Sequence, residues 1–148
     1  PEAIEWSLLE QHITALQKGN TVQQPVYSML TCLRTDQQVA ITPNKVLIVE
    51  GILILTQPEI RDLMSIKIFI DADADHRLMR VVKRDMEERG RDIDQVMTRY
   101  LNTVRPMHEQ FIEPSKRFAD IIVPVGGDNH VAIDLLSQYI AAQLLNSA

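Results

Sequence analysis

Two apolar stretches of the sequence carry an acidic residue at a place where it could bind a metal ion. In VLIVEGILIL (46–55) this residue is Glu50, and in IKIFID (66–71) it is Asp71. A carboxylate is costly in apolar surroundings unless it is partnered or lies at an exposed end. At the end of a strand it can hold Mg²⁺, directly or through water, for phosphoryl transfer. The alternative is a carboxylate that caps a neighbouring turn.

Three arginines lie close together in KRDMEERGRD, near the expected end of a helix. They are Arg84, Arg89 and Arg91. If they converge, their guanidinium groups could clamp phosphate oxygens and shield the charge of a transition state. The alternative is a solvated helix face on which i,i+4 ion pairs satisfy every arginine. The acidic residues available for such pairs are Asp85, Glu87 and Glu88.

Two glycines follow a third apolar stretch, in RFADIIVPVGGDN. Gly126 and Gly127 permit a close approach of the backbone, which suits a flat purine ring packed on the loop. The alternative is a tight turn in which Asp128 or Asn129 caps the last helix. Elsewhere, Tyr27 could stack on a ring, although tyrosine is also an ordinary strand residue.

The histidines and the cysteine suggest no metal centre or nucleophile. The four histidines show no zinc-ligand spacing; they are His12, His76, His108 and His130. Cys32 has no evident base partner, and as the single cysteine it cannot form an internal disulfide. We therefore expect a reducing compartment and a cytoplasmic protein.

The elements that must position these residues can be predicted from periodicity and end signals. Helices are expected at 4–17, 58–64, 73–90, 91–118 and about 130–145. Lys18 and Gly19 end the first, and Pro58 opens the second. The third has Asp73 as N-cap and ends at Gly90, and the fourth is interrupted at Pro106 and Pro114. A hairpin is expected at 25–42, starting at Pro25 and turning at TDQQ (35–38), and buried strands at 45–50, 66–71 and 119–125.

This order of elements predicts one α/β domain with a parallel sheet. In such sheets the ligand crevice lies beyond the carboxyl ends of the strands. Glu50 and Asp71 each end an expected strand, so we expect both side chains at that edge.

The composition restricts the classes of partner. Of 148 residues, 45% are apolar and 24% charged, which is ordinary for a globular protein. The net charge of −5 and the pI near 5.3 argue against a general nucleic-acid binder. No apolar run approaches the roughly 20 residues of a membrane span. We expect neither nucleic acid nor a membrane as partner.

Taken together and in order, these stretches resemble the uridine kinase (uridine–cytidine kinase) family from Pro1 to about Leu145. The matching stretches are PVYS, VLIVEGIL, RDLM, IFIDADADHRL, KRDMEERGRD, VRPMHEQFIEPSKRFADIIVP, and GGDN with VAID. The resemblance implies a P-loop-kinase-like parallel sheet flanked by helices, with a hairpin insertion at 25–42 and a helical lid at about 84–105. It implies transfer of the γ-phosphoryl group of ATP or GTP to the 5′-hydroxyl of uridine or cytidine.

The resemblance also implies roles for individual residues. Glu50 would lie near the Mg²⁺ ion, and the three arginines would gather around nucleoside and phosphates when the lid closes. The nucleoside pocket would include Tyr27, Ile52, Cys32 and Arg99. The GGDN loop (126–129) would receive the adenine of the donor. Family members are commonly homotetramers, so a homo-oligomer is expected.

The sequence departs from the family in its phosphate-binding segment and in its pocket. No G-x-x-x-x-G-K-[ST] motif occurs in the 148 residues, and of the family's Asp-His-Pro motif only Pro1 matches. We therefore expect the C-terminal two-thirds of such a kinase, inactive by itself. Cys32 stands where animal members have a base-reading histidine, and Val81 and Arg99 replace an arginine and a glutamine, which leaves the choice between uridine and cytidine open.

Two alternatives remain. One is a related P-loop kinase for another small alcohol, of the phosphoribulokinase or pantothenate kinase type. The other is a non-catalytic module that binds nucleotides or oligomerises.

Overall fold

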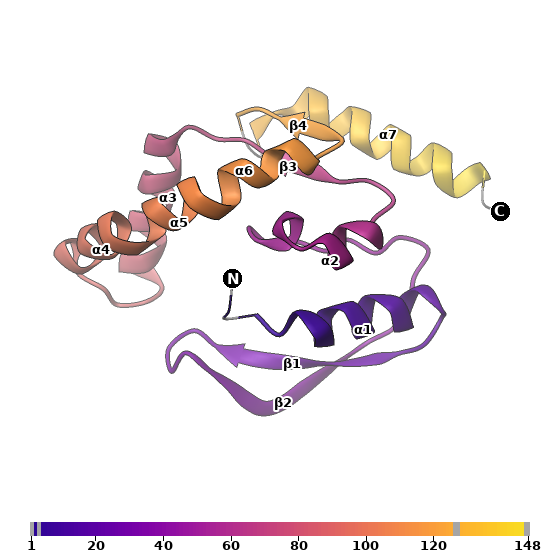
Figure 1. Ribbon diagram of the computed structural model, residues 1–148, viewed down its shortest axis with the longest axis horizontal. Helices are drawn as coiled ribbons and strands as arrows, with labels where there is room; N and C mark the ends of the chain where they lie inside the picture. The colour runs from indigo at the N-terminus through magenta and orange to yellow at the C-terminus, as the bar shows by residue number, and fades with distance from the viewer. Residues whose placement is uncertain (1, 3, 126–127, 147–148) are drawn as a thin grey trace.

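The computed structural model describes residues 2, 4–125 and 128–146, and shows a mixed α/β arrangement (Figure 1). The predicted fold class is confirmed. The strands are β1 (Val22–Ser28), β2 (Leu33–Ile41), β3 (Ile68–Ile70) and β4 (Ile121–Val123). The main helices are α1 (Trp6–Gln17), α2 (Pro58–Asp62), α3 (Ala74–Glu87), α4 (Ile93–Arg99) and α7 (His130–Asn146).

The parallel pair β3–β4 forms where two of the buried strands were predicted, but it is shorter, and only Phe69 and Val123 of its residues are buried. Its register joins Ile68 to Ile121 and Ile70 to Val123. A reciprocal clamp precedes it: Asp120 Oδ2 accepts from the Lys67 N–H at 2.7 Å, and the Asp120 N–H donates to the Lys67 carbonyl at 2.7 Å. The Lys67 Nζ lies 2.9 Å from the same carboxylate. These contacts fix the register where both strands begin.

The prediction of a buried strand at 45–50 is wrong. A strand needs a hydrogen-bonded neighbour, and among the described residues β3 pairs only with β4, while β1 pairs only with β2. The segment 45–50 therefore runs as irregular chain, and Ile48 is 79% exposed. Gly51 follows it in a tight place: a Cβ there would lie 3.1 Å from the Ile54 side chain, which would have to shift slightly.

The predicted hairpin forms, but its turn lies at 29–32 rather than at 35–38. The register passes from Pro25 opposite Gln38 to Tyr27 opposite Arg34, so the Thr35–Gln37 stretch bulges out of β2. The Thr35 hydroxyl donates to the Val26 carbonyl at 3.1 Å, so a side-chain hydrogen bond joins the bulge to β1. The polar residues at 35–38 mark the bulge rather than the turn. Their side chains can hydrogen-bond to nearby backbone groups in a bulge as well as in a turn, so the sequence alone does not distinguish the two.

Four of the five helices were placed correctly. Pro58 opens α2, and α1 ends at Gln17 with Gly19 at φ +83°. Asp73 is the N-cap residue of α3, although its side chain makes no capping hydrogen bond, and Gly90 has φ +61° beyond the helix end.

The two prolines do not interrupt the helical run from Ile93 to Phe118. Pro106 lies in α5 (Arg105–Met107) and Pro114 in α6 (Glu113–Ser115), each after a π-helical segment. These segments are η2 (Tyr100–Val104) and η3 (His108–Ile112), and the 3₁₀ turn η4 (Lys116–Phe118) follows α6. Proline lacks an N–H and clashes with the carbonyl four residues earlier; the wider π turns relieve both problems. The predicted breaks are therefore wrong.

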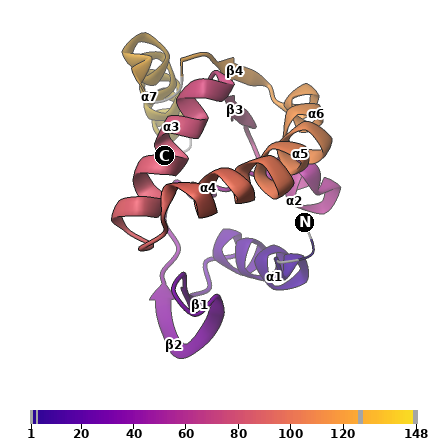
Figure 2. The same cartoon turned by 90° about the vertical axis from the view of Figure 1, so that its left-hand side faces the viewer.

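The helical run crosses the molecule from α3 to the parallel strands (Figures 1 and 2). At its end, the Arg61 guanidinium of α2 lies 3.7 Å from the centre of the Phe118 ring, and Arg61 Nη1 donates to the Leu55 carbonyl at 2.7 Å. The 3₁₀ turn η1 (Ile54–Thr56) precedes α2. The buried apolar residues in the described chain are Ile13, Val22, Leu55, Ile60, Phe69, Val96 and Val123.

Ile60 tests this packing. Because it is 2% exposed, Ile60→Ala should lower the free energy of unfolding by about 2–5 kcal/mol in urea titrations. Ile48→Ala is the matched control: its side chain is exposed, so the change should stay within about 0.5 kcal/mol. Equal losses in the two variants would contradict the described core.

Candidate functional site

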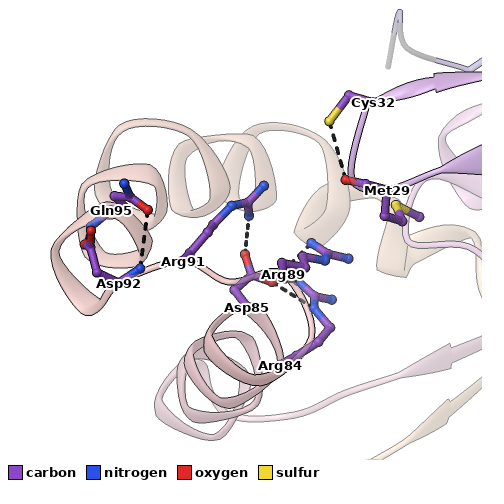
Figure 3. A network of polar contacts seen from close by, with 8 residues as sticks. All are labelled: Met29, Cys32, Arg84, Asp85, Arg89, Arg91, Asp92 and Gln95. Atoms are coloured by element: carbon purple, nitrogen blue, oxygen red, sulfur yellow. Dashed lines mark hydrogen bonds and ion pairs between the residues drawn. The ribbon is translucent and has the colours of Figure 1, made fainter.

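The three arginines of KRDMEERGRD converge on one carboxylate, that of Asp85 (Figure 3). The Nε of Arg84 donates to Oδ1 at 2.9 Å, and its Nη2 lies 2.8 Å from the same oxygen. Arg89 Nη1 lies 3.1 Å from Oδ1, while Arg91 Nη1 donates to Oδ2. The structure thus shows the convergence that the spacing allowed, with a protein carboxylate at its centre.

Asp85 occupies a buried position on α3. Its side chain is 2% exposed and follows the half-buried Leu78, Val81 and Val82 at the spacing i, i+3, i+4, i+7. This spacing is that of an apolar stripe, so α3 places a carboxylate where an apolar residue is usual. The solvated-face alternative anticipated the i,i+4 pair of Asp85 with Arg89, but not the burial of its acid.

The chain turns sharply after α3 and returns Arg91 to the same carboxylate. Gly90 takes a positive φ of 61°, which glycine adopts without the steric cost of a Cβ. The Arg91 N–H then donates to the Asp85 carbonyl at 3.1 Å. Asp85 therefore holds Arg91 through both its backbone and its side chain.

A capping box starts α4 directly after Arg91. The Gln95 N–H donates to Asp92 Oδ1 at 2.8 Å, and the Asp92 N–H donates to Gln95 Oε1 at 3.3 Å. One residue further on, Val96 is 1% exposed, and α3 contacts α4. The last aspartate of KRDMEERGRD is thus structural: it fixes where α4 begins relative to the arginines.

The cluster keeps positive charge for a ligand. Among the described residues, Asp85 is the only acid that pairs with these arginines, so two positive charges remain uncompensated. The side chains of Arg84, Arg89 and Arg91 are 43%, 19% and 24% exposed. Partly buried guanidinium groups of this kind bind anionic oxygens well, because little water competes for their N–H groups.

The charge state of Asp85 follows from its surroundings. Burial raises the pKa of its carboxyl, but the Arg84 hydrogen bond and the charges of Arg84 and Arg89 outweigh burial. The pKa therefore lies below its ordinary value of 3.8. Asp85 is ionised at neutral pH and serves as the counter-ion of the cluster.

The two predicted strand-end acids differ in their contacts. Glu50 follows irregular chain rather than a strand; it is exposed and has no ion-pair partner among the described residues. Asp71 lies just beyond β3, where its Oδ2 accepts from Lys116 Nζ at 2.5 Å. This bond is the first cause of a raised pKa of Lys116. Asp71 thus ties β3 to η4, whereas Glu50 is free to bind a cation.

The predicted pocket residues come from four separate places in the chain, and all are exposed. Tyr27 lies in β1, and Cys32 ends the hairpin turn with φ +56° and its Sγ 3.7 Å from the Met29 carbonyl. Ile52 precedes η1 and is 74% exposed. Arg99 ends α4, on a polar groove that Asp92 and Asn102 also line. Among these four described residues no hydrogen bond or ion pair joins one side chain to another, so their shared pocket stays a prediction.

The GGDN loop is described only in its second half; Gly126 and Gly127 lie outside the described residues. Asn129 Oδ1 accepts from the Ala132 N–H at 3.0 Å, the capping contact that the alternative interpretation predicted. Asp128 Oδ2 lies 3.5 Å from Arg80 Nη2, which links the loop to α3.

Three features were missed at the sequence level. An acid on the apolar stripe could have revealed Asp85, and the Asp92-x-x-Gln95 spacing could have revealed the capping box. No local signal reveals that Lys116 meets Asp71, 45 residues away. The structure also brings possible ligand atoms of Asp73, Asp75 and His76 within 4.8 Å of one another, but all three are exposed.

Comparisons with known proteins decide the family. The model of the phosphoribulokinase/uridine kinase family matches residues 1–132. The chain belongs to this family. It is 50% identical over 145 residues to the uridine kinase of Brevibacillus brevis, covering 98% of this chain and 68% of the relative. It is 51% identical over 144 residues to that of Vibrio cholerae, covering 97% and 68%.

The predicted resemblance is therefore confirmed, and with it the expectation of a kinase of this family. In the described part of the chain, no helix is both long enough and apolar enough to cross a membrane.

The lowered pKa of Asp85 makes a prediction about pH. Because the folded-state pKa is below 3.8, the stabilisation from the carboxylate is complete above that value and is lost as the pH falls through the folded pKa. The free energy of unfolding should therefore exceed that of Asp85→Asn by a constant amount above about pH 5, and the difference should shrink below about pH 3.8. Urea titrations between about pH 3 and 7 measure it. A difference that persists unchanged at the acidic end would contradict the ionised cluster.

Proposed function

We propose that the protein is a pyrimidine nucleoside kinase that transfers the γ-phosphoryl group of ATP or GTP to the 5′-hydroxyl of uridine or cytidine. The observation that carries the proposal is the convergence of Arg84, Arg89 and Arg91 at the end of α3. The names of the two relatives described above, both uridine kinases, support the choice of acceptor.

The arginine cluster suits the chemistry of the reaction. A transferring phosphoryl group spreads negative charge over its equatorial oxygens, and the enzyme contributes mainly positioning and charge stabilisation. Fixed guanidinium groups supply that stabilisation without reorganising during the reaction. We propose that the three arginines are the part of the lid, at about 84–105, that reaches the substrates, and that closure of the lid excludes water from the transfer.

Glu50 is proposed to hold Mg²⁺. Its carboxylate is exposed and unpaired among the described residues, and Mg²⁺ is usually bound through one or two carboxylates together with substrate phosphates. Asp71 fits less well, because Lys116 occupies its Oδ2. When bound, the ion neutralises charge on the phosphate oxygens of the donor.

The hairpin and its neighbours are proposed to recognise the nucleoside. Tyr27 offers an exposed ring for stacking, Ile52 an apolar surface, and Arg99 a hydrogen-bond donor. Cys32 offers only a weak donor and acceptor. We therefore propose that this pocket discriminates weakly between uridine and cytidine.

The donor base is proposed to rest on the GGDN loop (126–129), where the Arg80–Asp128 contact links the loop to α3. A phosphate cradle is also required, and the 148 residues contain no G-x-x-x-x-G-K-[ST] motif. We propose that turnover requires such a cradle in addition to these residues. A homo-oligomer in the cytoplasm is part of the same proposal.

A panel of acceptors tests the function. The full-length gene product, with ATP or GTP and Mg²⁺, should phosphorylate uridine and cytidine but neither ribulose 5-phosphate nor pantothenate, as measured by product formation in chromatography. Turnover of either of the last two would favour the related kinases, and nucleotide binding without any turnover would favour a non-catalytic module.

Arg91→Ala tests the role of the cluster. Losing a donor aimed at the transition state should lower kcat about 100-fold, with a much smaller effect on the fraction folded. Arg105→Ala is the matched control, because Arg105 is exposed and pairs only with Glu109 among the described residues. Proportional losses of kcat and of folded protein in Arg91→Ala would support the solvated-face alternative.

A further inference from the structure

The Asp85 carboxylate offsets the repulsion between the three guanidinium groups of the arginine cluster. Three guanidinium groups repel one another at close range, and in the described chain the Asp85 carboxylate is the one acidic group in contact with them. Arg84 and Arg89 share Oδ1, while Arg91 takes Oδ2. Because the two oxygens belong to one carboxylate, these contacts fix the positions of the three guanidinium groups relative to one another.

The contacts with Asp85 use only part of the hydrogen-bonding capacity of the arginines. A guanidinium has five N–H donors in a fixed plane. Arg84 contacts Asp85 through Nε and Nη2, and Arg89 and Arg91 each through Nη1. The Nη2 groups of Arg89 and Arg91 and the Nη1 group of Arg84 have no protein partner among the described residues. These donors remain for an anion.

The burial of an acid at position 85 is better explained by the ordering of the three arginines than by a contribution to the free energy of folding. It lies at the end of an apolar stripe, where an apolar side chain would pack without the cost of burying a charge. Replacing a buried ion cluster by apolar residues is often neutral or stabilising. The carboxylate also sits on the residue whose backbone carbonyl receives the Arg91 N–H, so the turn and the cluster share one anchor.

We propose that Asp85 is a positioning residue: its buried carboxylate sets the spacing of Arg84, Arg89 and Arg91 so that their remaining N–H groups form a preorganised site for the phosphate oxygens of the nucleotide. The inference rests on the proposed kinase function for the identity of the anion. Asp85 does not itself contact substrate; it acts through the arginines.

Two variants of the full-length gene product separate charge from position. Asp85→Asn keeps the shape but removes the charge, and Asp85→Glu keeps the charge but moves the carboxylate by one methylene group. Glu87→Gln is the matched control, because it removes an acid of α3 that has no ion pair among the described residues. Thermal unfolding is recorded for each variant, and kinetics are measured below the temperature at which unfolding begins.

The kinetic readout is a split between kcat and KM. Both Asp85 variants should lower kcat about 10- to 100-fold, the range typical for partners that orient catalytic groups. The KM for the donor should not rise in Asp85→Asn, because removing the acid makes the cluster more positive. Glu87→Gln should leave both parameters within about twofold. A kcat within twofold of the unmodified protein in both Asp85 variants would overturn the inference.

A second readout does not depend on activity. Phenylglyoxal modifies accessible arginines, and mass spectrometry gives the rate for each one. In the unmodified protein, inorganic tripolyphosphate should protect all three arginines at least fivefold. In Asp85→Asn the anion still binds the more positive cluster, but protection of at least one of the three arginines should be lost, whereas Glu87→Gln should match the unmodified protein. Equal protection with and without Asp85 would overturn the inference. If no nucleoside is phosphorylated but protection of all three arginines still requires Asp85, the positioning role stands and the kinase proposal fails.

Discussion

The ion cluster around Asp85 is the interaction on which the candidate site depends. A carboxylate that is 2% exposed lies at the end of α3 and contacts three arginines that reach it from two sides of a turn. Removing the acid would leave three partly buried cations without a counter-ion among the described residues, so Asp85 cannot be changed without consequence for the cluster. The geometry of the turn, the start of α4 and the direction of the arginines are therefore coupled.

The helical run that starts at α4 connects the turn after α3 to the parallel strands (Figure 2). The helical run that begins at α4 continues through two π-helical segments to η4, where Lys116 bonds to Asp71 beyond β3. The clamp between Lys67 and Asp120 then fixes β3 against β4. A continuous series of directional contacts thus joins the arginine cluster to the parallel strands, and a rigid scaffold of this kind is what preorganised charge stabilisation requires.

Local structure could be predicted where local chemistry decides it. The end of α3 shortly before Gly90, the opening of α2 at Pro58 and the end of α1 near Gly19 all depend on residues within one helical turn. The strand predicted at 45–50 failed because a strand depends on a neighbour, which a single apolar run does not reveal. The predicted breaks at Pro106 and Pro114 failed because a helix can widen instead of ending.

The candidate site was predictable only in part, for the same reason. The spacing of Arg84, Arg89 and Arg91 indicated convergence, but what they converge on depends on the burial of Asp85, which is set by the packing of α3 against α4. From the sequence alone, Asp85 is only one of three acids that could pair with the arginines on a solvated helix face. The contact between Lys116 and Asp71 joins residues distant in sequence and has no local signal.

The guanidinium resonances of the arginines test the central claim most directly. In ¹⁵N-labelled protein, bonding to Asp85 should slow rotation and proton exchange, so that the side-chain N–H signals of Arg84, Arg89 and Arg91 are observed as separate resonances at neutral pH. The account predicts that Asp85→Asn broadens or removes these three signals, while Glu87→Gln leaves them unchanged. Three sharp signals that persist without the Asp85 carboxylate would contradict the claim that this one acid organises the site.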